Sequence, residues 1–285
     1  MVHVDLEEQE RRCLSTNVRV FKSHFGKHPL HLCRVHRDLQ IAGHMTRDEA
    51  MSRNSFLAFM LSNNFLRCYE TADLRCARFS INLDDLKDFT WDFVGRIAAL
   101  KPFKIKCPNI WPVKLGASVD GTHVKTNEPR DPDMRRNPEN YSYKHNFAGL
   151  NYQIVLSLWT NHVWCATSGD PASTHDMAAI RAEFIAMVPE GCRVLADTGF
   201  IGKTEAEKRV FSIRNNLDDD EVAALKAKGR ARQEQFNKRM KDYQCLVKPF
   251  HHDIRKHVDC FNAVLVLVQY AIEDTSDVGE PLDTL

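Results

Sequence analysis

The sequence lacks the features that would place it in a membrane or a secretory pathway. No stretch of the 285 residues approaches about 18 uninterrupted apolar positions, the length that a membrane-spanning helix requires. The longest apolar run, residues 261–272, is shorter and contains Asn262 and Gln269. The opening residues also lack the basic and apolar segments of a signal peptide. We therefore expect a soluble intracellular protein that has no membrane partner.

Neither sign of charge is in excess. The chain carries 39 Lys and Arg against 38 Asp and Glu, a formal net charge of +1. This balance excludes a uniformly basic coat protein for nucleic acid and an acidic tail protein, so any contact with nucleic acid must come from local clusters of charge. Hydrophobic residues make up 43% of the chain, which argues against wholesale disorder.

Cysteine pairs are missing as well. The nine cysteines are odd in number and scattered, without a Cys-x-x-Cys pair, so we predict buried free thiols rather than a disulfide framework. One segment is dense in metal-ligand types, namely His24, His28, His31, Cys33 and His36. Its spacing matches no familiar paired-ligand pattern, and Leu30 and Leu32 alternate as in a strand or core edge. A zinc-dependent hydrolase centred here is kept as an alternative, which zinc in the purified protein would support.

The pattern of apolar residues changes near residue 112. Before it, Thr46 and Glu49 form a capping box that opens a helix, and a second helix begins after Asn82. The first of these helices would carry Phe56, Phe59 and Met60. We predict a helical region at residues 1–112 that serves packing, dimerisation or partner binding.

After residue 112 strands and helices alternate. Strands are predicted at 113–119, 148–158, 163–167 and 192–196, and helices from Thr174 or Asp176 onward, at 223–243 and at 253–272. The charged, proline-containing segment 131–140 reads as an exposed loop. This order predicts an α/β domain with a mixed sheet flanked by helices at residues 113–285.

Two acids occupy similar places in this second region. Asp120 ends one strand-like run and precedes Gly121, whereas Asp197 ends another and precedes Thr198-Gly199. Burying a lone carboxylate is costly unless it has a partner or a metal ion. If the two strands are neighbours, the two acids meet at one edge of the sheet, where a cation would offset their repulsion. The alternative is that each Asp begins a turn or caps the next helix.

A third acid, Glu234, lies in a basic helix. Residues 226–256 contain ten Lys and Arg against three Asp and Glu. Helical spacing places one set of side chains on a single face, Arg230, Glu234, Asn237, Lys238 and Lys241. A second face, with Phe236, Met240 and Tyr243, would pack on the sheet. The helix is therefore either a solvated helix with an internal Glu–Lys pair or a phosphate-binding face with one acid directed inward.

Five short motifs occur in one order along residues 116–273. They are Val-Asp-Gly-Thr-His, Tyr-Ser-Tyr-Lys-His, Gly-Leu-Asn-Tyr-Gln-Ile, Ala-Asp-Thr-Gly-Phe and Arg-x-Glu-x-x-Asn-x-Arg-x-Lys. This ordered set resembles the DDE superfamily of endonucleases, specifically the PIF/Harbinger-type transposases and proteins derived from them. The sequence departs from that pattern at Phe200, where such proteins often carry a tyrosine.

The resemblance implies an RNase H-like fold that cleaves DNA and transfers strands. It makes Asp120, Asp197 and Glu234 the catalytic and metal-binding carboxylates for two divalent cations, Mg²⁺ or Mn²⁺. It also implies DNA as the partner, a separate DNA-binding partner protein, a nuclear location and a possible homo-oligomer. Charge and position add candidate phosphate contacts at Lys144, Arg230, Lys238 and Lys241. The rival is a domesticated, non-enzymatic DNA- or chromatin-binding protein on the same fold, against which the three acids argue.

Other clusters have simpler explanations. Asp170, His175 and Asp176 could form a base with its orienting partner, but a helix N-terminus beside Ser173 and Thr174 explains them better. Trp159 and Trp164 could stack on bases, although packing around a hairpin is the more common use of such a pair. His252, His257 and Cys260 are expected to pack rather than to bind metal.

Overall fold

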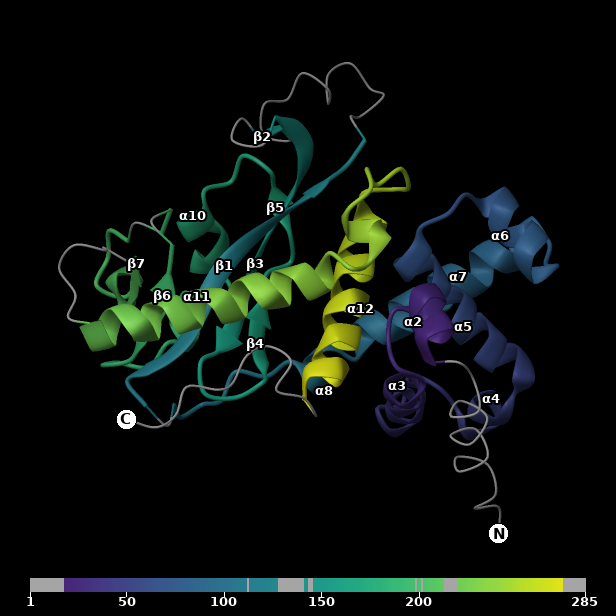
Figure 1. Cartoon of the computed structure of the whole chain (residues 1–285), viewed down its shortest axis with the longest axis horizontal. Helices are drawn as coiled ribbons and strands as arrows, with labels where there is room; N and C mark the ends of the chain where they lie inside the picture. The colour runs from purple at the N-terminus through teal and green to yellow at the C-terminus, as the bar shows by residue number, and fades with distance from the viewer. Residues whose placement is uncertain are drawn as a thin grey trace, which may run out of the picture. The chain divides into compact units, whose positions relative to one another are not determined.

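The structure, a computed structural model, describes residues 18–111, 113–127, 141–142, 146–197, 199–200, 202–212 and 220–273 (Figure 1). These residues form two compact units. Unit 1 comprises the described parts of Met1–Lys104, Met240–Lys248 and His252–Ala271, and unit 2 those of Ile105–Arg239, Pro249–His251 and Ile272–Leu285. The domain boundary near residue 112 stays a prediction, and the predicted loop at 131–140 lies outside the described residues. None of the described helices is both long enough and apolar enough to cross a membrane.

Unit 1 is helical, as the sequence predicts for its N-terminal part. Its helices are α2 (Val18–Phe25), α3 (Pro29–Ile41), α4 (Arg47–Met51), α5 (Arg53–Cys68), α6 (Ala72–Phe79), α7 (Leu83–Ala99), α8 (Lys101–Lys104), η4 (Gln244–Leu246) and α12 (Arg255–Ile272). Asn82 caps α7 through the Asp85 amide, as predicted. Both hydrogen bonds of the Thr46–Glu49 capping box are also present.

The helix that follows this capping box is shorter than predicted. It is α4, which ends at Met51, and the residues Phe56, Phe59 and Met60 belong to the next helix, α5. The reason is Ser52, whose extended backbone interrupts the helix and whose hydroxyl accepts the Ser55 N–H to start a new one. A second N-cap so close to the first was not recognised in the sequence.

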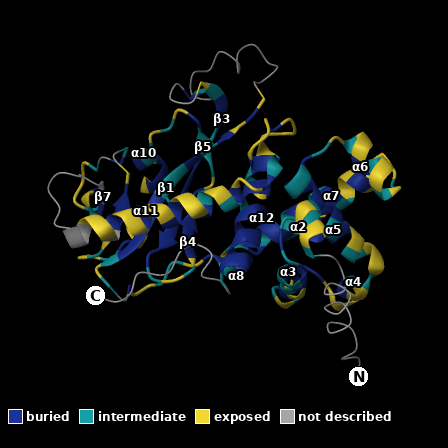
Figure 2. Cartoon of the chain, viewed as in Figure 1, coloured by how far each residue is buried: buried dark blue, intermediate teal, exposed yellow. Residues whose placement is uncertain are grey.

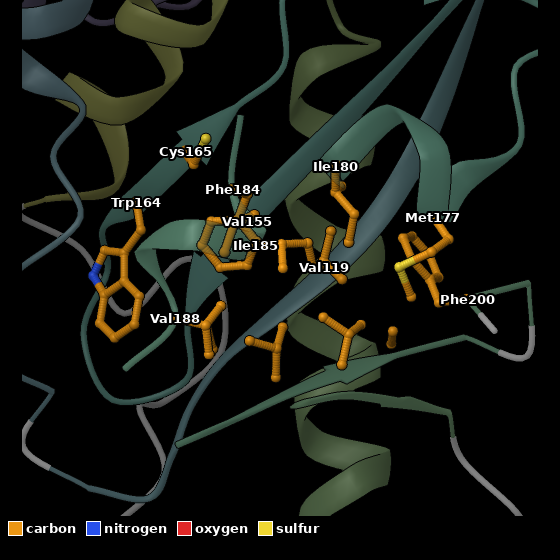
Figure 3. Close-up of a cluster of buried hydrophobic side chains, with 14 of the residues drawn as sticks. Val119, Val155, Trp164, Cys165, Met177, Ile180, Phe184, Ile185, Val188 and Phe200 are labelled. Atoms are coloured by element: carbon orange, nitrogen blue, oxygen red, sulfur yellow. The ribbon is translucent and has the colours of Figure 1, made fainter. Parts of the chain in front are cut away.

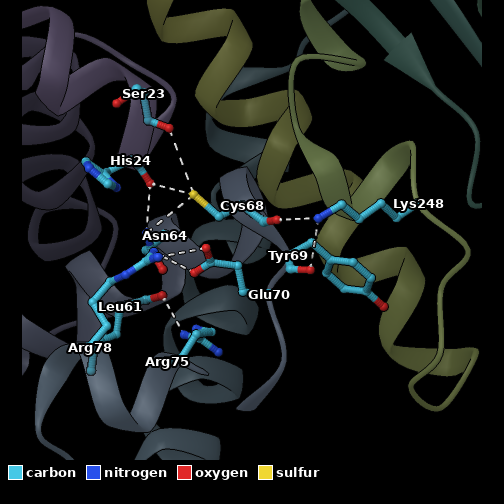
Figure 4. Close-up of polar contacts among 10 residues, drawn as sticks. All are labelled: Ser23, His24, Leu61, Asn64, Cys68, Tyr69, Glu70, Arg75, Arg78 and Lys248. Atoms are coloured by element: carbon cyan, nitrogen blue, oxygen red, sulfur yellow. Dashed lines mark hydrogen bonds and ion pairs between the residues drawn. The ribbon is translucent and has the colours of Figure 1, made fainter. Parts of the chain in front are cut away.

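Polar contacts join the chain segments of unit 1 around the end of α5 (Figure 4). Lys248 Nζ donates to the Cys68 carbonyl at 3.0 Å, and Asn64 Nδ2 donates to the His24 carbonyl at 3.1 Å. Arg75 is buried and donates to the Leu61 carbonyl at 2.8 Å. Of these carbonyls, that of Leu61 is buried, so its bond from Arg75 avoids the cost of leaving it unsatisfied.

Unit 2 is built on a mixed sheet. Its strands are β1 (Leu115–Lys125), β2 (Tyr141–Ser142), β3 (Phe147–Ser157), β4 (Val163–Ala166), β5 (Asp170–Pro171), β6 (Arg193–Ala196) and β7 (Val210–Ser212). The order is β2-β3-β1-β6-β7, with β4 and β5 also paired to β3. The β1–β3 pair is antiparallel, whereas β1–β6 and β6–β7 are parallel. This mixed sheet, with helices beside it and a helical region before it, confirms the predicted RNase H-like α/β class.

The helical segments of unit 2 are α10 (Asp176–Arg181), η2 (Ile185–Met187), η3 (Glu207–Arg209) and α11 (Asp220–Met240). The α10 side of the sheet carries an apolar core (Figure 3), which includes Val119, Val155, Met177, Ile180, Phe184, Val194 and Phe200. The Phe200 side chain is buried there, beside Met177 in the same view. Trp164 packs against Trp111 with ring centroids 4.8 Å apart, and Trp159 Nε1 donates to the Leu115 carbonyl at 2.6 Å. Ring packing of Trp164 and the hydrogen bond of Trp159 therefore account for the two tryptophans of the β3–β4 hairpin.

Candidate active site

Asp120 and Asp197 follow neighbouring positions of two parallel strands. The last paired positions of β1 and β6 are Val119 and Ala196, so each acid is the next residue along its strand. The predicted meeting of the two acids therefore occurs. The prediction that Asp120 ends its strand was wrong, because β1 runs on to Lys125 while paired to β3. What ends at Asp120 is the parallel pairing with β6.

Polar side chains fix α11 on the sheet next to Asp120. Gln233 accepts a hydrogen bond from Ser118 Oγ at 3.0 Å and donates to the Ile154 carbonyl at 3.1 Å. One turn later, Asn237 Nδ2 donates to Asp120 Oδ2 at 2.8 Å. Residues four apart lie on one face of a helix, so these contacts set the rotation of α11 about its axis. Glu234, adjacent to Gln233, is consequently presented at the rim of the site.

All three predicted acids line one pocket of unit 2. Its walls come from β1, the end of β6 and α11, and its lining is Ser118, Val119, Asp120, Leu195, Ala196, Asp197, Gly229, Arg230, Gln233 and Glu234. Figure 2 shows that exposed residues occur along much of α11. The three predicted acids therefore lie at one pocket, whereas Gln233, which docks the helix, was not among the predicted site residues.

The three carboxylates do not close around a single point. Within the part of the chain that the structure describes, no group of three or more His, Cys, Asp or Glu side chains could hold a metal ion. This includes the segment around His28, which lies in and before the helix α3 rather than in a strand; Leu32 of this segment is buried in the core, the other predicted alternative. His28 Nδ1 accepts the Leu30 N–H. Glu234 instead accepts a hydrogen bond from Arg230 Nε at 3.2 Å. Both of these side chains are about two thirds exposed, at 66% and 64%. Such a pair contributes roughly 0–1 kcal/mol and is easily exchanged for another partner.

The donor atoms at the pocket nevertheless suit a hard divalent cation. Carboxylate oxygens of Asp120, Asp197 and Glu234 are ligands that Mg²⁺ and Mn²⁺ prefer. Beside them, Asn237 Oδ1 is buried and accepts no hydrogen bond within the described residues. An unsatisfied buried oxygen next to a carboxylate calls for a cation or a donor. The side chains at the pocket therefore have the chemistry to bind a divalent cation, although the three carboxylates do not yet converge on one point.

The predicted DNA contacts are only in part on the helix. Arg230 and Lys238 are exposed on α11. Lys241 is exposed too, but it follows the last residue of α11, Met240, so it is not on the helix as predicted. Lys144 lies outside the described residues.

A polar network that the sequence analysis missed lies at the start of α10. His175 is the N-cap, since its Nδ1 accepts the Met177 N–H at 3.3 Å, and the predicted cap at Thr174 or Asp176 was wrong. Asp176 Oδ1 accepts from Asn151 Nδ2 at 3.1 Å and from Gln153 Nε2 at 2.9 Å. Asn151 and Gln153 are fully buried. Two polar residues at alternate positions of an otherwise apolar strand were the signal available in the sequence.

The segment that follows Asp197 is held by a second carboxylate. Glu207 accepts the backbone N–H of Lys203 at 2.7 Å and a bond from Arg181 Nε at 2.5 Å. The Lys203 amide, followed by the Arg181 guanidinium, lowers the pKa of Glu207 to about 2. Glu207 therefore remains ionised at neutral pH and ties the chain beyond Asp197 to α10.

Comparison with known proteins gives one match. A family model described as DDE superfamily endonuclease matches residues 119–269, more than half of the chain. The matched span contains Asp120, Asp197 and Glu234. No curated protein and no solved structure matches the chain significantly.

Proposed function

Since the chain belongs to the DDE superfamily of endonucleases, we propose that it cleaves DNA phosphodiester bonds with divalent metal ions held by Asp120, Asp197 and Glu234. The observation that carries this proposal is the single pocket lined by all three acids. We further propose that the protein is a PIF/Harbinger-type transposase, or a protein derived from one, and that it also transfers DNA strands. The order of the five sequence motifs supports this further proposal.

The metal requirement follows from the family and from the donor atoms. Enzymes of this superfamily generally use divalent metals, which supply Lewis-acid activation of the nucleophile and neutralise charge at the scissile phosphate. Asp120 is the ligand whose orientation is already fixed. Its Oδ2 accepts from Asn237 and its Oδ1 accepts the Gly121 N–H at 2.9 Å. A carboxylate held on both oxygens needs little reorganisation when substrate binds.

Glu234 is the adjustable member of the set. We propose that it leaves Arg230 when metal and DNA bind, because an exposed ion pair costs little to break. Arg230 would then contact a DNA phosphate, together with Lys238. Lys241 and Lys144 are proposed as further phosphate contacts on the basis of their charge. Phosphate contacts supply affinity without reading sequence. We therefore propose that a separate DNA-binding partner protein selects the target sequence. The complex would act in the nucleus, and the chain would be a homo-oligomer.

Cleavage of supercoiled plasmid tests the proposal. We expect nicked and linear DNA with Mn²⁺ or Mg²⁺ and none with EDTA, because the reaction needs the metal ions. Glu234→Gln should abolish cleavage, whereas Glu190→Gln, an exposed glutamate of unit 2 outside the pocket lining, should not. Plasmid that binds the protein but stays intact with both metals would instead favour a domesticated DNA- or chromatin-binding protein.

A further inference from the structure

The residues directly behind the candidate acids point to an additional participant. We propose that Asp176 is a positioning residue, which sets the distance between the backbone segments that carry Asp120 and Asp197. The inference rests on the proposed function and deepens it. Asp176 is not among the residues that line the pocket, so it would act through the backbone rather than on metal or DNA.

Strand alternation places Asp176 on the other face of the sheet from α11. Ser118 and Asp120 contact Gln233 and Asn237 of α11. Residues 117, 119 and 121 of β1 point to the opposite face, and Ala117 and Val119 pack there with Met177 of α10. The Asp176 carboxylate therefore lies on the face of the sheet opposite to α11, and it comes close to the backbone of β1 at Gly121.

The Asp176 carboxylate is held in place by neutral donors. Its Oδ1 accepts from Asn151 and Gln153, whose side chains are fully buried. Gln153 Nε2 also donates to Asn151 Oδ1 at 2.9 Å, and Asn151 Nδ2 donates to the Thr174 carbonyl at 3.1 Å. These bonds restrict the carboxylate to one orientation, which is the property that a spacer requires.

Two glycines show what this carboxylate separates. A Cβ at Gly121, the residue after Asp120, would lie 3.2 Å from Asp176 Oδ1 and 3.0 Å from Gln153 Nε2. A Cβ at Gly199, two residues after Asp197, would lie 2.9 Å from Asp176 Oδ2. Neither glycine has a left-handed backbone, so lack of space rather than backbone conformation explains them. The glycines of Asp-Gly and Asp-x-Gly thus both accommodate Asp176.

A spacer of fixed size between the backbone segments at Gly121 and Gly199 would set the distance between Asp120 and Asp197. Residues that orient metal ligands from behind typically affect metal affinity or activity by about 10- to 100-fold. Size, rather than charge, is the property that this role predicts to matter. Two substitutions separate the properties, because Asp176→Asn keeps the size and removes the charge, whereas Asp176→Glu keeps the charge and adds a methylene.

Mn²⁺ titration with a short DNA duplex tests the role. We expect Asp176→Glu and Asp176→Ala to lower Mn²⁺ affinity and cleavage by about 10- to 100-fold with DNA affinity unchanged, and Asp176→Asn to stay near wild type. Asp170→Glu, on β5 and outside the contacts with both glycines, is the control. Asp176→Glu equal to wild type, or Asp176→Asn as impaired as Asp176→Ala, would overturn the inference. A wild-type protein that binds no Mn²⁺ contradicts the proposed function and this role together.

The contact itself is tested without metal. Gly199→Ala should lower the melting temperature because its methyl group meets Asp176 Oδ2. In an Asp176→Ala background the same change should lower it less, since the obstruction is gone. Equal effects of Gly199→Ala in both backgrounds would show that the carboxylate does not separate these segments, whatever the protein does with metal.

Discussion

Asp120→Asn is expected to lower the metal-dependent cleavage rate on the order of 1000-fold. The carboxylate would be a metal ligand at a position that Asn237 and the Gly121 amide already fix. Metal stabilisation of the transition state amounts to several kcal/mol, and about 1.4 kcal/mol corresponds to a tenfold change in rate. The substitution keeps the shape of the side chain, so the fold should survive and Mn²⁺ affinity should fall with the rate.

The measurement is a single-turnover cleavage assay, with Mn²⁺ affinity from calorimetry on the same preparations. Asp88→Asn is the matched control, because Asp88 is exposed on α7 in unit 1 and lies far from the pocket in sequence. Cleavage by Asp120→Asn within tenfold of wild type would remove Asp120 from the reaction.

The second large effect is a loss of stability of unit 1 in mild acid. His36 and His257 are 2% and 0% exposed, and burial lowers the pKa of each from 6.5 to about 4. Between pH 6.5 and about pH 4, these two histidines bind protons in the unfolded chain but not in the folded chain. Stability is therefore complete above about pH 6.5 and is lost as the pH falls toward 4. Each histidine should contribute about 1.4 kcal/mol per pH unit, so each accounts for on the order of 3 kcal/mol between pH 6.5 and pH 4.

Denaturant unfolding at intervals from pH 7.5 to pH 4.5 measures this slope. His36→Phe removes one titrating group and keeps an aromatic ring against Phe56 and Phe59, whose centroids lie 5.5 and 5.3 Å from that of His36. The slope should fall by about half in this variant, because one of the two buried histidines no longer titrates. A His36→Phe slope equal to that of wild type would mean that His36 is protonated in the folded state.

Much of unit 2 could be predicted from local pattern. Runs of β-branched and apolar residues located β3, β4 and β6 within a residue or two, because strand periodicity is a local property. Asp120 and Asp197 stood out since an acid that follows a buried strand is chemically costly. The placement of Glu234 by the pocket depended on helical spacing within a basic segment, which is local as well.

Features that depend on distant partners were missed. The Asp176 network depends on Asn151 and Gln153, more than 20 residues earlier. The length of β1 past Asp120 depends on β3, which continues the pairing where β6 stops. Most of the last helix, α12, belongs to unit 1 although its sequence follows unit 2. Sequence periodicity gives the type of such elements but not their partners.

The most direct test of the central claim is the anomalous diffraction signal of Mn²⁺ in crystals of the protein with a DNA duplex. We expect two Mn²⁺ ions bound by Asp120, Asp197 and a Glu234 that has left Arg230. Mn²⁺ bound elsewhere, or a pocket that binds DNA without metal while Glu234 stays on Arg230, would contradict it.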